Sequence, residues 1–148
     1  LAHDAVNPGI EVLGGNGAIE SSSILPRLLR DNVVYENWEG THNVLRAQVL
    51  RDCARLGVHQ GFFDVLAEVL GHETVADDRA ELDEILGLDP DLAALRFRRL
   101  ASRMAVHVMS AAMAGNKALE DHAIMLQRHL GEVAVDASYM ALVRRLQR

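Results

Sequence analysis

The chain has 148 residues, of which 49% are hydrophobic and 24% are charged, and its net charge is -6. This composition suits one domain, or one compact piece of a larger protein, with a real apolar core. The acidic balance argues against a generally basic nucleic-acid-binding protein, and neither a signal peptide nor an uncharged run long enough to span a membrane is present. Cys53 is the only cysteine, which excludes an internal disulfide and fits the cytoplasm, where we expect the protein to reside.

The first helix is expected at the start of the chain, where Ala2, Ala5 and Val6 are typical of a helix interior. Because the chain opens within this pattern and without an initiator methionine, we expect it to be a fragment of a longer protein. Asn7-Pro8-Gly9 predicts an interruption, since proline lacks an amide donor and clashes with the preceding turn. Residues 10–13 are then expected to resume the helix briefly.

A glycine loop follows, with the sequence Gly14-Gly15-Asn16-Gly17. Such a loop permits tight turning and lets the backbone approach a ligand phosphate or ring. It does not match the dinucleotide-binding fingerprint, because no strand precedes it and the glycine spacing differs. The alternative is a helix end with a left-handed cap, and the residues alone favour this alternative.

The next segment predicts a short helix that begins after three serines. Residues 21–23 offer caps, and Pro26 would lie in the first turn. We expect residues 31–37 to be a connector. The charged side chains Arg27, Arg30 and Asp31 could pair with other subunits or be solvated, and solvation is the default for exposed charges.

A single acid, Glu39, lies on a turn between Trp38 and an amphipathic helix. Gly40 permits backbone angles that bulky residues resist, and Thr41 can cap the first turn of that helix. The apolar side of the helix comprises Val44, Leu45, Val49, Leu50, Cys53 and Leu56, and we expect the cysteine to pack rather than react. A carboxylate in a partly apolar pocket holds its proton more tightly and becomes a useful base near neutral pH. The alternative is a surface turn glutamate beside a buried tryptophan, and spacing alone favours that alternative.

The second half of the chain predicts a helical scaffold without strands or repeats. One helix ends at Leu56-Gly57, and the next ends at Gly71 with an apolar stripe of Phe62, Phe63, Leu66, Val69 and Leu70. Residues 74–77 resemble a capping box for a helix over 78–86. Asp89-Pro90-Asp91 predicts a strong helix start.

The helix that starts there is expected to run to about Ala114, with an apolar side formed by Leu92, Leu95, Leu100, Met104, Val108 and Met113. Gly115-Asn116 predicts a turn. A last helix is expected from Lys117 towards Arg148, with a possible bend at Gly131. These last two helices should form a long antiparallel hairpin.

Two groups of side chains in this half are candidate ligand sites. A basic face for DNA could be built from Arg96, Arg98, Arg99, Arg103, Arg144, Arg145 and Arg148, but residues 45–148 carry 13 basic against 15 acidic side chains. A phosphate-binding surface needs a clear basic excess, so DNA binding is weakly supported. The histidines His107, His122 and His129 lack a metal-binding framework, so no metal site is predicted.

Three segments, in this order and spacing, resemble the C-terminal signature of acyl-CoA dehydrogenases: 11–17 (EVLGGNG), 25–31 (LPRLLRD) and 38–43 (WEGTHN). The tryptophan before Glu-Gly, the Glu-Val-Leu before Gly-Gly and the long tail are most similar to the AidB-type branch, the alkylation-response acyl-CoA dehydrogenases. The resemblance covers roughly residues 1–56 and is specific as an ordered set, because each piece alone is weak. The tail is similar in placement and helicity only.

This resemblance implies a role for each matching residue near the turn. Glu39 falls on the catalytic base, which removes the α-proton of an acyl-CoA while the β-hydrogen leaves as hydride to the flavin N5. Gly40 falls where the backbone borders the thioester and the flavin. Thr41 and Asn43 fall on positions that contact FAD, and Asn43 stands where glutamine is frequent in the family.

The resemblance also implies a role for the glycine loop. Glu11, Gly14 and Gly15 match a loop that approaches the FAD of a neighbouring subunit. Ala18 stands where an aromatic residue is common after the third glycine.

The predicted fold is therefore all-α: a helical bundle that forms the rear of an acyl-CoA dehydrogenase C-terminal domain over residues 1–56, with a helical extension over 57–148. The resemblance implies an FAD-dependent acyl-CoA dehydrogenase that acts on an acyl-CoA in the intact protein as a homo-oligomer, a dimer or a tetramer. The fragment alone should be inactive, because it lacks the N-terminal and middle domains. The alternative is an AidB-like DNA-docking or oligomerisation module with a vestigial flavin site.

Overall fold

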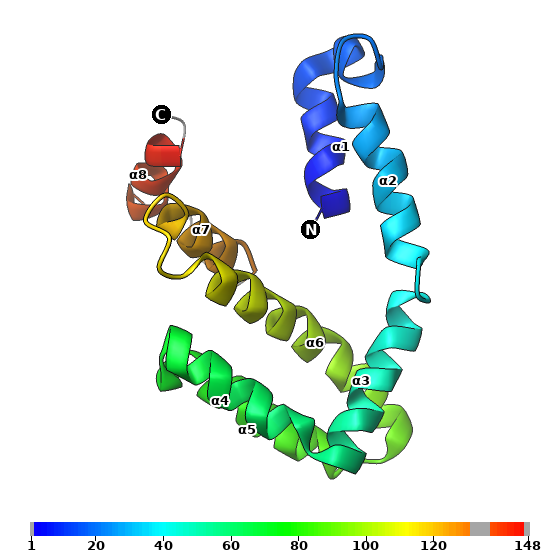
Figure 1. Cartoon of the computed structure of the whole chain (residues 1–148), viewed down its shortest axis with the longest axis vertical. Helices are drawn as coiled ribbons and strands as arrows, with labels where there is room; N and C mark the ends of the chain where they lie inside the picture. Colours follow the sequence, from blue (N-terminus) through cyan, green and yellow to red (C-terminus); the bar gives the residue numbers. More distant parts are fainter. Residues whose placement is uncertain (1, 131–136, 147–148) are drawn as a thin grey trace. The chain divides into compact units, whose positions relative to one another are not determined.

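The computed structural model describes residues 2–130 and 137–146, and within these ranges the chain forms helices and no strand (Figure 1). This finding confirms the all-α prediction. The helices in chain order are α1 (Ala2–Leu13), the 3-10 helix η1 (Gly14–Ala18), α2 (Leu25–Asn37), α3 (His42–Leu56), α4 (Val58–Leu70), α5 (His72–Leu86), α6 (Pro90–Met113), α7 (Glu120–Leu130) and α8 (Ala137–Leu146).

The chain divides into two compact units. Unit 1 is Leu1–Leu45 and unit 2 is Arg46–Arg148. The division falls inside α3, ahead of the boundary after residue 56 that the sequence predicts between the dehydrogenase-like segment and its extension. Compactness and family membership are different properties, so the predicted domain boundary stays a prediction.

In unit 1, α1 runs without the interruption predicted at Asn7-Pro8-Gly9, and Pro8 lies inside the helix. That prediction was wrong. Proline removes the backbone bond of its own nitrogen and crowds the preceding turn, at a local cost in stability. The packing of α1 against α2 and η1, with Val6 buried, offsets that loss, because tertiary contacts supply most helix stability in proteins.

The glycine loop ends α1 and forms η1. Gly14 has a φ of +57°, the left-handed conformation expected where a helix terminates. Gly17 is buried, and a Cβ at this position would lie 2.4 Å from the carbonyl oxygen of Ile10. Only glycine fits so close to the α1 backbone, so the third glycine has a structural reason to be present.

The start of α2 agrees only in part with the predicted serine cap, because the N-cap residue is Ile24, which makes no side-chain cap bond. The Ser23 hydroxyl accepts a hydrogen bond from the Leu25 amide at 3.0 Å, and Pro26 lies in the first turn. The helix is longer than predicted, however, because residues 31–37 continue it and do not form a connector. Its inner stripe passes from Leu29 to the partly buried Asn32 and Glu36, and these polar residues concealed the helical period.

Unit 2 has a closed apolar core between α4, α5 and α6, to which the end of α3 contributes Cys53. The largest fully buried apolar side chains are Phe63, Phe97, Leu82, Ile85 and Leu100. On α6 the buried residues Ala93, Phe97, Leu100 and Met104 follow a regular helical spacing. The prediction for this stripe was right for Leu100 and Met104. It was wrong for the large residues Leu92, Leu95 and Val108, which are exposed.

Two helix starts in unit 2 test the capping predictions. Asp89 caps α6 as predicted, because its side chain accepts a hydrogen bond from the Asp91 amide at 3.0 Å. The capping box at residues 74–77 was wrong, because α5 already begins at His72. Gly71, with a φ of +92°, reverses the chain within one residue, and the Thr74 hydroxyl donates back to the Leu70 carbonyl at 2.9 Å.

The last helix predicted over residues 117–148 is divided into α7 and α8, which pack together. Arg145, in the last turn of α8, donates two hydrogen bonds of 2.6 and 2.8 Å to Asp121, in the first turn of α7. The two helices are therefore antiparallel, and the prediction of a single helix over residues 117–148 was wrong. The possible bend at Gly131 lies outside the described residues, and the long hairpin stays a prediction, although α6 packs on α7.

Candidate functional site

Glu39 lies on the turn between α2 and α3 in unit 1. The turn closes through a hydrogen bond from the Gly40 amide to the Asn37 carbonyl at 3.3 Å. Gly40 has a φ of +119°, a conformation that side chains resist. The Thr41 carbonyl accepts the first bond of α3 from the Leu45 amide at 3.1 Å. This geometry presents the Glu39 carboxylate just before a helix N-terminus, as the sequence predicts.

The surroundings of Glu39 differ from the partly apolar pocket that a base requires. Glu39 is exposed, and Trp38 beside it is 75% exposed rather than buried. One turn earlier on α2, Tyr35 is 80% exposed. Within unit 1, nothing covers this apolar and aromatic surface. A pocket around the carboxylate would have to be completed by polypeptide or ligand outside this segment.

The remaining predicted site residues are also accessible. Gly40 is partly buried, whereas Thr41 and Asn43 are exposed at the start of α3. Glu11 is exposed in the last turn of α1, and Gly14 and Gly15 follow it directly. A Cβ at either glycine would meet no atom within 4 Å, so their backbone is open to a ligand. Gly17 is not, because Ile10 fills the space beside it.

The two groups of predicted residues lie at opposite ends of α2. Figure 1 shows the glycine loop before α2 and the turn that holds Glu39 after it. A helix of 13 residues is about 20 Å long. Within one chain, Glu11, Gly14 and Gly15 therefore cannot face the same atoms as Glu39. This separation is compatible with a loop that serves a neighbouring subunit.

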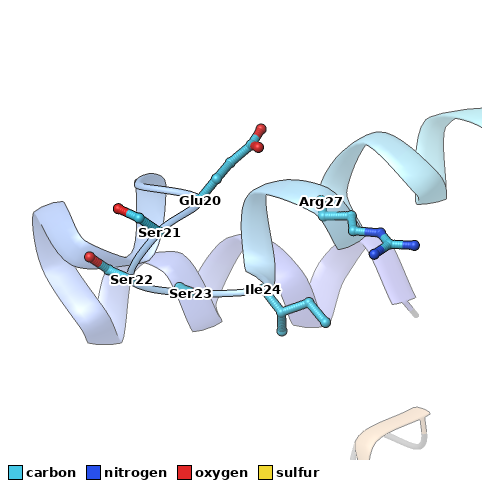
Figure 2. Close-up of a pocket in the computed structure, with 6 residues that line it drawn as sticks. All are labelled: Glu20, Ser21, Ser22, Ser23, Ile24 and Arg27. Atoms are coloured by element: carbon cyan, nitrogen blue, oxygen red, sulfur yellow. The ribbon is translucent and has the colours of Figure 1, made fainter.

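An open depression of about 410 Å³ lies between η1 and α2 (Figure 2). Its lining comprises residues 20–24 and Arg27, none of which is a predicted site residue. In Figure 2 the Glu20 carboxylate and the Ser21 and Ser22 hydroxyls point outward rather than toward one another. Glu20 also pairs with Arg30 at 2.5 Å, and Arg27 pairs with Asp31 at 3.7 Å. These local pairs account for the charges, and the depression shows no convergent binding geometry.

Among the described residues, the most buried charged cluster lies in unit 2, between α5 and α6, and none of the predictions from the sequence includes it. Asp78 accepts hydrogen bonds from Arg103 Nε at 2.7 Å and faces His107 Nε2 at 2.9 Å, and Arg103 also pairs with Glu81. Burial raises the pKa of Asp78, but the hydrogen bonds from His107 and Arg103 and the charge of Arg103 outweigh it. The pKa of Asp78 is therefore lowered from its ordinary value of 3.8. The cluster joins two helices and lines no cavity among those described.

The same contacts explain part of the arginine run on α6. Arg96 pairs with Glu84 on α5 at 2.7 Å, and Arg103 is held by Asp78 and Glu81. The spacing of Arg96, Arg103 and His107 along α6 matches a run of acids on α5, which is the signal that could have revealed this contact. Among the remaining arginines of the proposed basic face, Arg145 pairs with Asp121. Three others are exposed: Arg98, Arg99 and Arg144. Arg148 lies outside the described residues.

No group of three His, Cys, Asp or Glu side chains that could hold a metal ion occurs in the part of the chain that the structure describes. His107 faces Asp78, His122 is exposed, and the side chain of His129 is outside the described set. Cys53 is buried. Burial, followed by the nearby charge of Asp52, raises the pKa of its thiol, which agrees with a packing role.

Comparison with known proteins finds a family match in the first part of the chain. Residues 1–54 match the profile of the family described as acyl-CoA dehydrogenase, C-terminal domain. The chain is also similar to acyl-CoA dehydrogenase family member 11 of Caenorhabditis elegans, with 39% identity over 75 residues, which are 50% of this chain and 12% of that protein. The chain thus spans a small part of the length of the curated relative that it matches. No solved structure matches the chain.

These matches confirm the resemblance of residues 1–54 to an acyl-CoA dehydrogenase C-terminal domain, and this segment contains every predicted site residue. The matches do not show membership of the AidB-type branch, so that assignment stays a prediction. The role of the extension over residues 57–148 also stays a prediction. Within residues 2–130 and 137–146, the structure contains no helix with the length and apolar character that a membrane crossing requires.

Proposed function

We propose that this chain is the C-terminal part of an FAD-dependent acyl-CoA dehydrogenase, in which Glu39 is the catalytic base. The observation that carries the proposal is the match of residues 1–54 to the family's C-terminal domain. Within that match, Glu39 lies on a glycine turn at the start of α3, where its carboxylate is accessible. The intact protein would form a double bond between the α and β carbons of an acyl-CoA thioester.

In this reaction the Glu39 carboxylate takes the proton from the α carbon, and the β carbon loses a hydride. FAD supplies the acceptor for that hydride. Gly40 would let the backbone border the thioester, because it has no side chain and its φ of +119° is one that other residues resist.

The residues present fit an FAD-binding role in two places. Thr41 and Asn43 offer an exposed hydroxyl and an exposed amide at the start of α3. Glu11, Gly14 and Gly15 form an accessible edge at the end of α1, where the open glycine backbone permits a close approach. Because these two groups are separated by the length of α2, we propose that they serve the FAD sites of two different subunits of a homo-oligomer.

Unit 1 also supports the proposal that further domains of the same protein complete the site. α2 has no buried residue, and its exposed apolar side chains include Val33, Val34, Tyr35 and Trp38. Exposed apolar surface of this extent usually marks a contact. We propose that the N-terminal and middle domains of the intact enzyme cover it, and that this segment alone is inactive. A cytoplasmic location remains part of the same proposal.

The test is Glu39→Gln in the full-length protein, with the reduction of bound flavin by acyl-CoA measured anaerobically. Loss of a positioned base should slow flavin reduction by about 10²–10⁴-fold or more, while the flavin content stays unchanged. Glu36→Gln, on the preceding turn of α2, is the matched control for loss of a charge and should retain the rate. Unchanged reduction in Glu39→Gln would remove the enzymatic proposal.

The alternative, an AidB-like docking or oligomerisation module with a vestigial flavin site, has less support from the contacts. Three of the arginines that suggested a DNA-binding face, Arg96, Arg103 and Arg145, are engaged by acids of unit 2. A direct test is binding of duplex DNA at increasing salt, since phosphate contacts weaken steeply with ionic strength. Absence of binding at low salt would end this alternative, and salt-sensitive binding would revive it.

A further inference from the structure

We draw no further inference here: the strongest candidate, the exposed apolar stripe that Val58, Val65 and Val69 form along α4, carries none because nothing in the structure shows what covers it.

Discussion

Asp78 provides the sharpest test of how unit 2 is held together. One of its carboxylate oxygens lies 2.7 Å from Nε of Arg103, and the other lies 2.9 Å from Nε2 of His107. Both of these partners are on α6. We predict that Asp78→Asn, which keeps the shape and removes the charge, destabilises unit 2. In this variant Arg103 keeps its ion pair with Glu81, and its side chain is 39% exposed. The loss of the bond between Arg103 and residue 78 should therefore cost little stability. The bond to His107, whose side chain is 13% exposed, should dominate.

A hydrogen bond to a charged group contributes about 1.5–3 kcal/mol, and breaking one partner of a buried pair leaves the other without compensation. We therefore expect Asp78→Asn to lower the free energy of unfolding by about 2–3 kcal/mol. Asp77→Asn, on the exposed neighbouring position, is the matched control and should change it by less than about 0.5 kcal/mol.

The assay is urea unfolding followed by far-UV circular dichroism, combined with hydrogen exchange of the α5 and α6 amides. Trp38 is the only tryptophan and lies in unit 1, so fluorescence would report the wrong unit. The m-value should stay constant if only stability changes. Equal stability of Asp78→Asn and Asp77→Asn would refute the claim that this carboxylate joins α5 to α6.

The effect should also depend on pH with a defined sign. Because the pKa of Asp78 is lowered in the folded protein from its ordinary value of 3.8, the native state favours the ionised carboxylate. The stabilisation is fully present above the ordinary value and is lost as the pH falls through the lowered one. The difference in stability between wild type and Asp78→Asn should therefore shrink in acid. A difference that grows as the pH falls would contradict this assignment.

Three further substitutions or treatments test local features. Gly17→Ala should destabilise unit 1 by about 1–3 kcal/mol, because its Cβ would meet the Ile10 backbone. Gly15→Ala is the control and should be tolerated, because the space around Gly15 is open. Proteolysis compares the two variants, and equal resistance would count against the contact. Asp89→Ala should cost about 1 kcal/mol by loss of the cap, measured by thermal unfolding, and Asp89→Ser should recover most of it. Cys53 should react slowly with a thiol reagent in the folded protein and fast in urea, because it is buried; rapid labelling without denaturant would show that the core around it opens.

The local backbone geometry around the candidate site could be predicted from sequence because its signals are local. The turn at Gly40, the helix end at Gly14 and the start of α3 are set by a few consecutive residues, and the structure shows the turn and the helix end where the sequence expects them. The environment of Glu39 could not be predicted in the same way. Whether Trp38 is buried depends on polypeptide that covers it, and the other residues of unit 1 leave it exposed.

The wrong predictions of helix bounds and buried faces have a common cause, which is the packing of helices against one another. Pro8 and the polar residues Asn32 and Glu36 weaken the local helix signal, yet α1 and α2 continue through them because the two helices pack against each other. On α6, hydrophobicity alone favoured Leu95 over Ala93. The close approach of neighbouring helices buries the small residue and leaves the large one exposed.

The sequence by itself determined the helical class, most helix ends and the ordered motifs around Glu39, because helix period, glycine turns and caps are properties of short stretches of chain. Only the tertiary structure decided which helix faces are buried, that α7 and α8 fold back on each other, and that Arg103 and His107 serve Asp78. These outcomes depend on side chains more than twenty residues apart in sequence, and no local pattern specifies which distant charge or apolar face will be the partner.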